Sequence, residues 1–385
     1  MHFAWTEEQE ELRAQARAFL AEHSSSEAVR RAMQSELGYD EALWKRLGAE
    51  LGWTALPIPE AYGGLGLSAI ELVALLEETG RALLCAPFFS TLCLAAPALL
   101  AAGSEAQKRE QLPGIAAGET RAALAFPGPS GRWDARGVEL VAERSGGGHV
   151  LRGSACYVQD GHCADLVIAA ARAPGSVGEQ GISLFALRAD AAGLSREALV
   201  TLDQTRRQAR LRFEGVALPA AARLGAEGCA WPLLSEVLDR AAVALAAEQL
   251  GGAQACLDAA VAYAKQREQF GRPIGSFQAI KHKCADMLVA VESARSAAYY
   301  AGWAAAHSPA ELPSAASLAK AACSEAFFRC AAENLQIHGG VGFTWEYDVH
   351  LYFKRARSSA TLLGDAAYHR ERLAGLIGLG EAARA

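Results

Sequence analysis

The amino-acid sequence predicts an α+β protein with an N-terminal helical domain, a middle antiparallel β-domain and a C-terminal four-helix bundle. Two observations support this prediction. Apolar residues recur every three to four positions before about residue 118 and again after about residue 231, which is the helical period. Between these regions, glycine-rich turns separate short apolar or alternating runs, as is typical of strands. The predicted domains are residues 1–118, 119–230 and 231–385, and we expect the β-domain to form a small barrel or sandwich.

The first domain is expected to be helical across residues 6–117. The segments ELGYDE, PIPEAYGGLG and GSEAQK carry residues that end one helix and start the next. The stretch 82–103 has no charged residue and is long enough to span a bilayer. However, Pro87 and Pro97 interrupt it, and the sequence has no second stretch of this kind. We therefore expect a buried helix pair and no membrane insertion.

The second domain is predicted from its turns. GPSGRWD, ERSGGGH and APGSVGEQG are rich in glycine and polar residues, which favour tight reversals of the chain. The runs between them, such as HVLRGSACYV, DLVIAAAR and ISLFALR, suit strands with at least one buried face. Short strands joined by such turns favour an antiparallel sheet.

The third domain is predicted from four helical runs. The run that starts at Trp231 continues for more than 30 residues, two comparable runs cover 276–306 and 311–337, and a last one covers about 365–379. Long helices with short connections pack as antiparallel neighbours, which predicts the four-helix bundle.

Composition excludes several classes of function. The net charge is −6 and basic residues never form a block, so we expect no nucleic-acid partner. The nine cysteines are odd in number and form no CxxC pair, which predicts neither a metal site nor a disulfide framework. The N-terminus has acidic residues where a signal peptide needs basic ones. These features predict a cytoplasmic protein with reduced cysteines.

Two motifs contain more than the turns around them require. In REQFGRPIGSFQ, residues 267–278, the glycines and the proline are explained by a helix end and restart. A helix end and restart does not explain Arg267, Phe270 and Gln278. An arginine there can offer a fork of donors to a diphosphate, phenylalanine a flat face to a ring, and glutamine an amide to a polar edge. In QIHGGVG, Gly339 and Gly340 fit a helix C-cap, but they also let a ligand approach the backbone.

Together with PEAYGGLGLS at 59–68, and in this order and spacing, the two motifs resemble the acyl-CoA dehydrogenase family. The resemblance runs nearly from end to end. It implies a homotetramer, a homodimer or a heterotetramer with a related subunit, an acyl-CoA substrate, electron-transferring flavoprotein as electron acceptor, and FAD held between subunits. The positions that match the family's FAD contacts are Arg267, Gln269, Phe270, Gln278, Gln336, Gly339 and Gly340.

The flavin-facing segments of the β-domain depart in part from the family pattern. Ala125 and Phe126 stand where the family carries threonine and glutamate. In the segment ACYVQ, Tyr157 replaces a tryptophan that stacks on the flavin, and Gln159 can still hydrogen-bond to its ring. The resemblance therefore implies that Tyr157 and Gln159 contact the cofactor, although a hydroxyl donor is lost.

The catalytic base is the larger departure. Family members remove the α-proton of the thioester with a glutamate, and the two positions where that glutamate occurs are Leu363 and Ala241 here. The candidates for a displaced base are Asp365, Glu248 and, less favoured, Asp239. Each also has a structural interpretation: Asp365 as a helix N-cap, and the other two as solvated or ion-paired helix acids.

Three functions agree with these residues. The first is α,β-desaturation of an acyl-CoA thioester, with α-proton abstraction by a displaced base and β-hydride transfer to FAD. The second is a non-catalytic subunit that clamps FAD in a heteromeric dehydrogenase, because the residues that would serve a neighbour's cofactor are intact and those that would serve its own substrate are altered. The third is a flavin monooxygenase or oxidase on the same fold.

Overall fold

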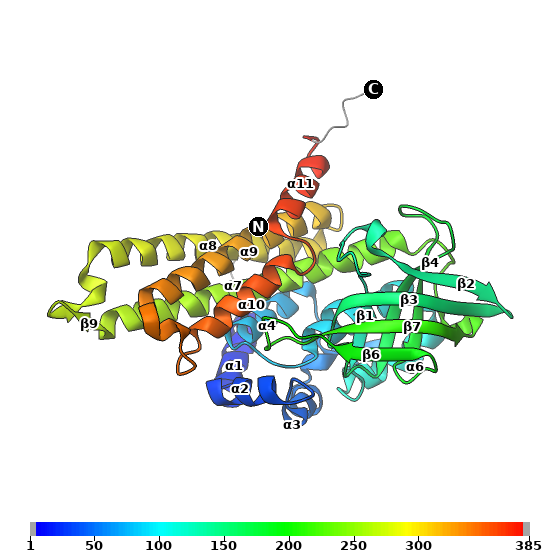
Figure 1. Ribbon diagram of the computed structural model, residues 1–385, viewed down its shortest axis with the longest axis horizontal. Coiled ribbons are helices and arrows are strands. Elements are labelled where there is room, and N and C mark those ends of the chain that lie inside the picture. The colour runs from blue at the N-terminus through cyan, green and yellow to red at the C-terminus, as the bar shows by residue number, and fades with distance from the viewer. Residues whose placement is uncertain (1–4, 380–385) are drawn as a thin grey trace. The chain divides into compact units, whose positions relative to one another are not determined.

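The computed structural model describes residues 5–379. The described residues form two compact units, each assembled from separate segments of the chain. The first contains the residues up to Arg31, Ser68–Leu84 and those from Ala242 onward. The second contains Ala32–Leu67 and Cys85–Ala241. The order of elements is helices, then a sheet, then long helices, so the predicted fold class is confirmed (Figure 1).

The first unit begins with a capped helix. Thr6 accepts a hydrogen bond from the backbone N–H of Gln9, and the Gln9 side chain accepts one from the Thr6 N–H, so α1 (Glu7–His23) starts with a capping box. Helix α2 (Ser26–Gln34) follows. Helix α4 (Ala69–Arg81) starts with the same motif, made by Ser68 and Glu71. Local sequence therefore fixes where both helices begin.

Long helices make up most of the first unit. Helices α7 (Trp231–Gln266), α8 (Gln278–His307) and α9 (Leu312–His338) run side by side in Figure 1, and α11 (Ala366–Leu376) packs on α9. These are the four predicted helices. A fifth, α10 (Val349–Thr361), was not predicted, because the glycine-rich motif before it was interpreted as a turn.

Helices α4 and α7 approach each other closely enough to exclude a side chain. A Cβ atom on Gly80 would lie 2.0 Å from the carbonyl oxygen of Glu248, and one on Gly251 would lie 1.8 Å from the carbonyl oxygen of Glu77. Only glycine fits at both positions, because the obstacle is backbone and cannot turn away. The backbone around Glu248 is therefore held in place by α4.

The second unit starts with short helical segments. The uncharged stretch predicted as a buried helix pair forms a π-helical segment, η4, that continues into α5, and both are largely buried. Within residues 5–379, no helix has the length and apolar character needed to cross a membrane. The helical segments of this unit are α3 (Glu41–Lys45), η1 (Arg46–Glu50), η2 (Trp53–Ala55), η3 (Glu60–Tyr62), η4 (Ser90–Ala95), α5 (Ala96–Ala102), α6 (Glu105–Ala116), η5 (Ala135–Gly137) and η6 (Ala220–Ala222).

The sheet of the second unit is mixed rather than wholly antiparallel. Its path runs β6-β7-β3-β2-β4-β5-β8, with β1 paired to β4, and among the described residues no pairing closes it into a barrel. Strands β1 and β2 both run parallel to β4. The strands are β1 (Ala122–Ala125), β2 (Leu140–Ser145), β3 (Gly148–Gln159), β4 (Leu166–Arg172), β5 (Ile182–Arg188), β6 (Leu194–Ala198), β7 (Gln208–Leu218) and β8 (Arg223–Leu224).

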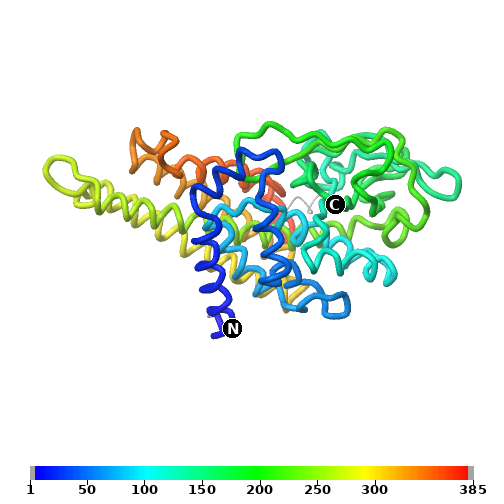
Figure 2. The backbone as a smooth tube through the Cα atoms, turned by 90° about the horizontal axis from the view of Figure 1, so that it is seen from below, coloured from blue at the N-terminus to red at the C-terminus, as the bar shows by residue number. Residues whose placement is uncertain are grey.

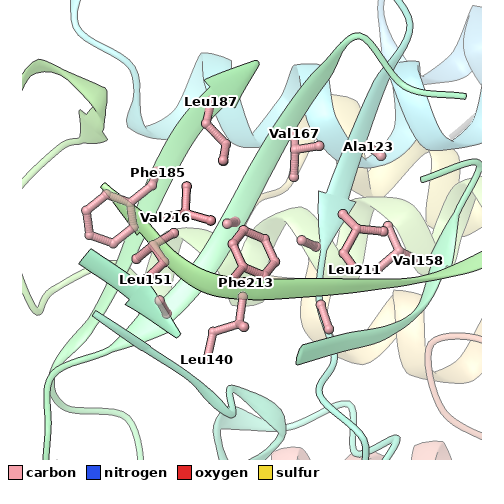
Figure 3. Close-up of a cluster of buried hydrophobic side chains, with 14 of the residues drawn as sticks. Ala123, Leu140, Leu151, Val158, Val167, Phe185, Leu187, Leu211, Phe213 and Val216 are labelled. Atoms are coloured by element: carbon pink, nitrogen blue, oxygen red, sulfur yellow. The ribbon is translucent and has the colours of Figure 1, made fainter. Parts of the chain in front are cut away.

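One face of this sheet carries an apolar core. Phe185 and Phe213 come from β5 and β7, and Figure 3 shows them near Leu151 and Val216. All four side chains are excluded from water. Burying a side chain of this size stabilises the fold by about 1.5–3 kcal/mol, so the cluster helps to fix β3, the strand that carries Tyr157 and Gln159.

Candidate functional site

The two predicted cofactor motifs lie at the same end of the long-helix bundle. Helix α7 ends at Gln266, α8 begins at Gln278, and α9 runs antiparallel to α8 and ends at His338. Figure 2 shows the chain reversing between α7 and α8 in a narrow loop at the tip of the two helices. The ring of Tyr263 on α7 stacks on that of His338 at 4.0 Å between centroids, which ties the ends of α7 and α9 together.

The loop between α7 and α8 is a small hairpin. Strands β9 (Glu268–Gln269) and β10 (Arg272–Pro273) pair antiparallel, and η7 (Ile274–Ser276) leads into α8. The N–H of Ile274 donates to the carbonyl oxygen of Arg267 at 2.7 Å and closes the hairpin. Phe270 and Gly271 at its tip have φ of 55° and 75°, which is costly for phenylalanine. The hairpin therefore fixes the backbone at Phe270 in this unusual conformation.

Aromatic and cationic side chains gather on this hairpin. The Phe270 ring is 91% exposed and meets Phe277 edge-on at 6.0 Å. The Arg272 guanidinium lies 4.2 Å from the centre of the Phe277 ring, a cation–π contact. Arg267, Gln269 and Gln278 are exposed. Within the described chain, no carboxylate lies at ion-pair distance from Arg267, so its charge is available to an anion.

The second motif leaves its backbone open. Gly339 ends α9 with φ 64° and ψ −143°, and it begins η8 (Gly339–Phe343). A Cβ atom built on Gly339 or Gly340 would meet no atom within 4 Å. These glycines are thus not required by internal packing, although the positive φ of Gly339 favours glycine there. Gln336, one turn earlier on α9, is exposed.

Tyr157 and Gln159 lie on β3, in the second unit. Tyr157 has φ of 57° and is partly exposed, and its ring packs beside Gly131. The Gln159 side chain is almost fully buried, and its Nε2 donates to the Tyr157 carbonyl oxygen at 3.1 Å. Its Oε1 is buried and accepts no hydrogen bond from the described residues. A buried acceptor without a donor is uncommon and points to an absent partner group.

The position that the family resemblance assigns to the usual catalytic glutamate carries an apolar side chain. Leu363 is 3% exposed and adopts φ of 61°, and Gly364 follows with φ of 98°. This tight turn connects α10 to α11. The alternative position, Ala241 on α7, is fully buried. Neither side chain has a group that can accept a proton from a substrate.

A buried lysine and a buried histidine hold this turn. Lys320 on α9 is fully buried, and its Nζ donates to the carbonyl oxygens of Gly364 at 2.9 Å and Ala360 at 3.3 Å. It also donates to Ser324 Oγ at 2.9 Å. Burial lowers the pKa of Lys320 to about 7. His369 lies with its Nε2 2.9 Å from the Leu363 carbonyl oxygen, and burial lowers its pKa to about 3. The neutral ring therefore donates this hydrogen bond.

Of the three acids considered as displaced bases, one caps a helix and two are buried on α7. Asp365 is exposed and caps α11, since its side chain accepts from the N–H of Tyr368 at 2.8 Å. Glu248 is buried on α7, where its backbone is packed against Gly80. Asp239 is also buried on α7. The geometry of Asp365 thus agrees with its interpretation as a helix N-cap.

Comparison with known proteins identifies the family. Family models match the chain over residues 6–119, as the N-terminal domain of acyl-CoA dehydrogenase, and over residues 230–377, as the C-terminal domain. The acyl-CoA dehydrogenase IpdE2 of Mycobacterium tuberculosis is 37% identical over 359 residues, which cover 93% of each chain. This chain belongs to the acyl-CoA dehydrogenase family. The resemblance inferred from the motifs is confirmed.

Solved structures share the whole fold of this acyl-CoA dehydrogenase. The butyryl-CoA dehydrogenase of Megasphaera elsdenii superposes with a TM-score of 0.90 at 28% identity, covering 98% of this chain and 100% of that one. A chain of the ChsE4-ChsE5 complex from Mycobacterium tuberculosis superposes with a TM-score of 0.89 at 28% identity, covering 98% and 99%. The protein is an oxidoreductase of this family, and its cofactor is FAD.

The residues of this acyl-CoA dehydrogenase fit FAD in three respects. Arg267 offers an unpaired guanidinium to a diphosphate. Gly339 and Gly340 leave space against the backbone. Gln159 offers a buried acceptor, Oε1, to an N–H of a flavin ring. These residues would hold the cofactor.

Sequence reasoning missed Lys320 and His369. A signal for Lys320 was present, because it lies on the same helical face as Ala316, Cys323 and Phe327, all buried. A lone lysine on an apolar face indicates a buried amine that needs acceptors. The acceptors could not be predicted, since they are carbonyl groups some 40 residues further along the chain.

Proposed function

We propose that this acyl-CoA dehydrogenase takes part in the α,β-desaturation of an acyl-CoA thioester as the subunit that grips FAD, in an assembly where another chain supplies the carboxylate base. The proposal rests on one observation. The two positions at which relatives place that carboxylate are filled by Leu363 and Ala241, both buried and apolar. Asp365, the acid closest to Leu363 in sequence, is already engaged as a helix cap.

The chemistry of desaturation explains why this observation supports the proposal. A base must remove the α-proton from hydrogen-bond distance, and its pKa must suit that task. FAD, when bound, supplies the acceptor for the β-hydride. A leucine can only pack against the substrate and exclude water. In this proposal, Arg267 pairs with the diphosphate of the cofactor, Phe270 offers its exposed face to a flat ring, and Gly339 and Gly340 allow close backbone approach.

The location of these groups supports a role toward a neighbouring subunit. They lie exposed at the tip of the bundle rather than in a cavity of their own unit. We therefore propose an oligomer, and among a homodimer, a homotetramer and a heterotetramer we favour the last. The ChsE4-ChsE5 structure, a complex of two differently named chains, supports that choice by analogy. Electron-transferring flavoprotein is the proposed electron acceptor, on the family resemblance alone.

The test compares the chain alone with its native assembly. The tagged protein is purified from its own cells with the chains that accompany it, and separately without them. Anaerobic bleaching of the flavin is followed with a panel of acyl-CoA thioesters. We expect the assembly to bleach and the single chain not to do so. Asp365→Asn and Glu248→Gln should each leave the rate of the assembly within about twofold, as should a control at an exposed acid, Asp190→Asn.

The opposite result would identify a base in this chain. If Asp365→Asn or Glu248→Gln lowered the rate by about a hundredfold or more with the FAD content unchanged, that residue would be the proton acceptor, since general bases contribute at least this much. Bleaching by the chain alone, at the rate of the assembly, would also contradict the proposal.

A further inference from the structure

A polar cavity of about 510 Å³ lies among α1, α4, α7 and α8. All of its walls belong to the first unit, and neither the hairpin nor the turn at Leu363 contributes to it. Its volume is in the range of small-molecule sites. Four arginines line it: Arg13, Arg17, Arg81 and Arg295.

The carboxylates at this cavity already pair with its arginines. Among the lining acids, the exposed Glu10 and Asp258 pair with Arg13 and Arg81, and two buried acids, Glu77 in the lining and Glu78 beside it, accept several hydrogen bonds. Glu77 is buried and accepts from Arg295 Nη1 at 2.6 Å, from the Tyr299 hydroxyl at 2.7 Å and from Arg13 Nη2 at 3.3 Å. Glu78, also buried, accepts from Arg17 Nε at 2.9 Å and Nη2 at 2.7 Å, a bidentate pair. The two carboxylates therefore have little capacity left to bind a cation.

Several N–H groups that line the cavity, in contrast, have no hydrogen-bond acceptor among the described residues. The Nε of Arg13 and the Nε1 of Trp5 are buried and have no hydrogen-bond partner. Arg17 Nη1 donates to no group within residues 5–379, and Arg81 uses only Nη2, toward Asp258 at 2.7 Å. Surplus donors on planar guanidinium groups are complementary to the oxygens of a carboxylate or a phosphate.

We propose that this cavity binds a small oxyanion, a carboxylate or a phosphate, through the unused N–H groups of Arg81, Arg17, Arg13 and Trp5. The site is separate from the proposed flavin-gripping role and does not depend on it. The Trp5 ring meets Tyr299 edge-on at 4.4 Å, and Arg13 lies 5.4 Å above it. An anion that entered beside this pair would offer acceptor oxygens to these buried N–H groups.

The test is calorimetric titration of the purified full chain with sodium phosphate and, separately, with sodium succinate, at constant ionic strength held with chloride. We expect saturable binding of at least one anion, and the stronger one identifies the ligand class. Arg81→Gln should weaken it at least about tenfold, the loss expected for one charge-assisted hydrogen bond. Arg188→Gln is the control, because Arg188 makes a matching 2.7 Å pair with Asp190 but lies on β5.

A second variant keeps the test decisive if Arg81→Gln does not fold. Trp5→Phe keeps an aromatic ring beside Tyr299 but has no N–H, so it should also weaken binding while Arg188→Gln does not. Absence of saturable binding of both anions would overturn the proposal. So would binding that Arg81→Gln and Trp5→Phe leave equal to that of the control.

Discussion

Lys320→Met should change how the stability of this protein depends on pH. The amine of Lys320 is fully buried on α9, and burial lowers its pKa from 10.5 to about 7. The unfolded chain keeps this proton up to about pH 10.5, whereas the folded chain releases it near pH 7. Unfolding therefore takes up a proton between these values, and the free energy of unfolding must rise with pH across this window.

The size of the effect follows from the shift. One pKa unit corresponds to about 1.4 kcal/mol, so the penalty for burying this lysine is about 5 kcal/mol below pH 7 and disappears by about pH 10.5. Between pH 7 and about 8.5 the lysine alone raises the free energy of unfolding by about 1.5 kcal/mol. Methionine has a similar length and no charge, so the variant lacks this contribution at every pH.

The assay is urea unfolding at fixed protein concentration, at several pH values from about 7 to about 8.5. The quantity of interest is the free energy of unfolding of the wild type minus that of Lys320→Met. It should rise by about 1.5 kcal/mol across the window. Buried thiols such as Cys330, whose pKa burial raises to about 12, act on both proteins alike and cancel. An exposed lysine on α3 supplies the control, Lys45→Met, for which the difference should stay flat. A flat difference for Lys320→Met as well would refute the reasoning.

The remaining predictions concern the hairpin and the contact between α4 and α7. Arg267→Ala should lower the affinity of the assembly for FAD by about tenfold to a hundredfold, because hydrogen bonds to charged groups contribute about 1.5–3 kcal/mol. Equilibrium dialysis measures this affinity, and an unchanged value would show that Arg267 does not contact FAD. Gly80→Ala should destabilise by about 2 kcal/mol or more, because its Cβ would lie 2.0 Å from the Glu248 carbonyl oxygen. On α11, the Cβ of Gly375→Ala would meet no atom within 4 Å, so this variant should be more stable by about 0.5–1 kcal/mol. Denaturant midpoints that shift in the same direction for both glycine variants would contradict the packing argument.

The layout of the fold could be predicted because it depends on local signals. The helical period marks α7, α8 and α9, and the capping residues Thr6 and Ser68 set the starts of α1 and α4. The break between α7 and α8 could also be located, because its glycines and proline end one helix and restart the next, although the hairpin inside the break was not predicted. Periodicity and turn chemistry are properties of neighbouring residues, so no tertiary information was needed.

Features that depend on distant partners could not be predicted in this way. The parallel pairing of β1 with β4 joins Ala122 to Leu166, and nothing in either segment states that the other is its neighbour. Helix α10 was hidden by the glycines that precede it. The contacts of Lys320 with Ala360 and Gly364 likewise arise only when α9 packs beside the turn.

The turn at residues 360–365 has a consequence for how this fold diverges among its relatives. The buried amine of Lys320 needs the carbonyl oxygens of Ala360 and Gly364 whatever side chain stands between them. The lysine and the backbone shape are thus expected to be inherited together, whichever side chain stands at position 363. A relative can therefore carry a different side chain at this position and still need the same buried amine beneath it.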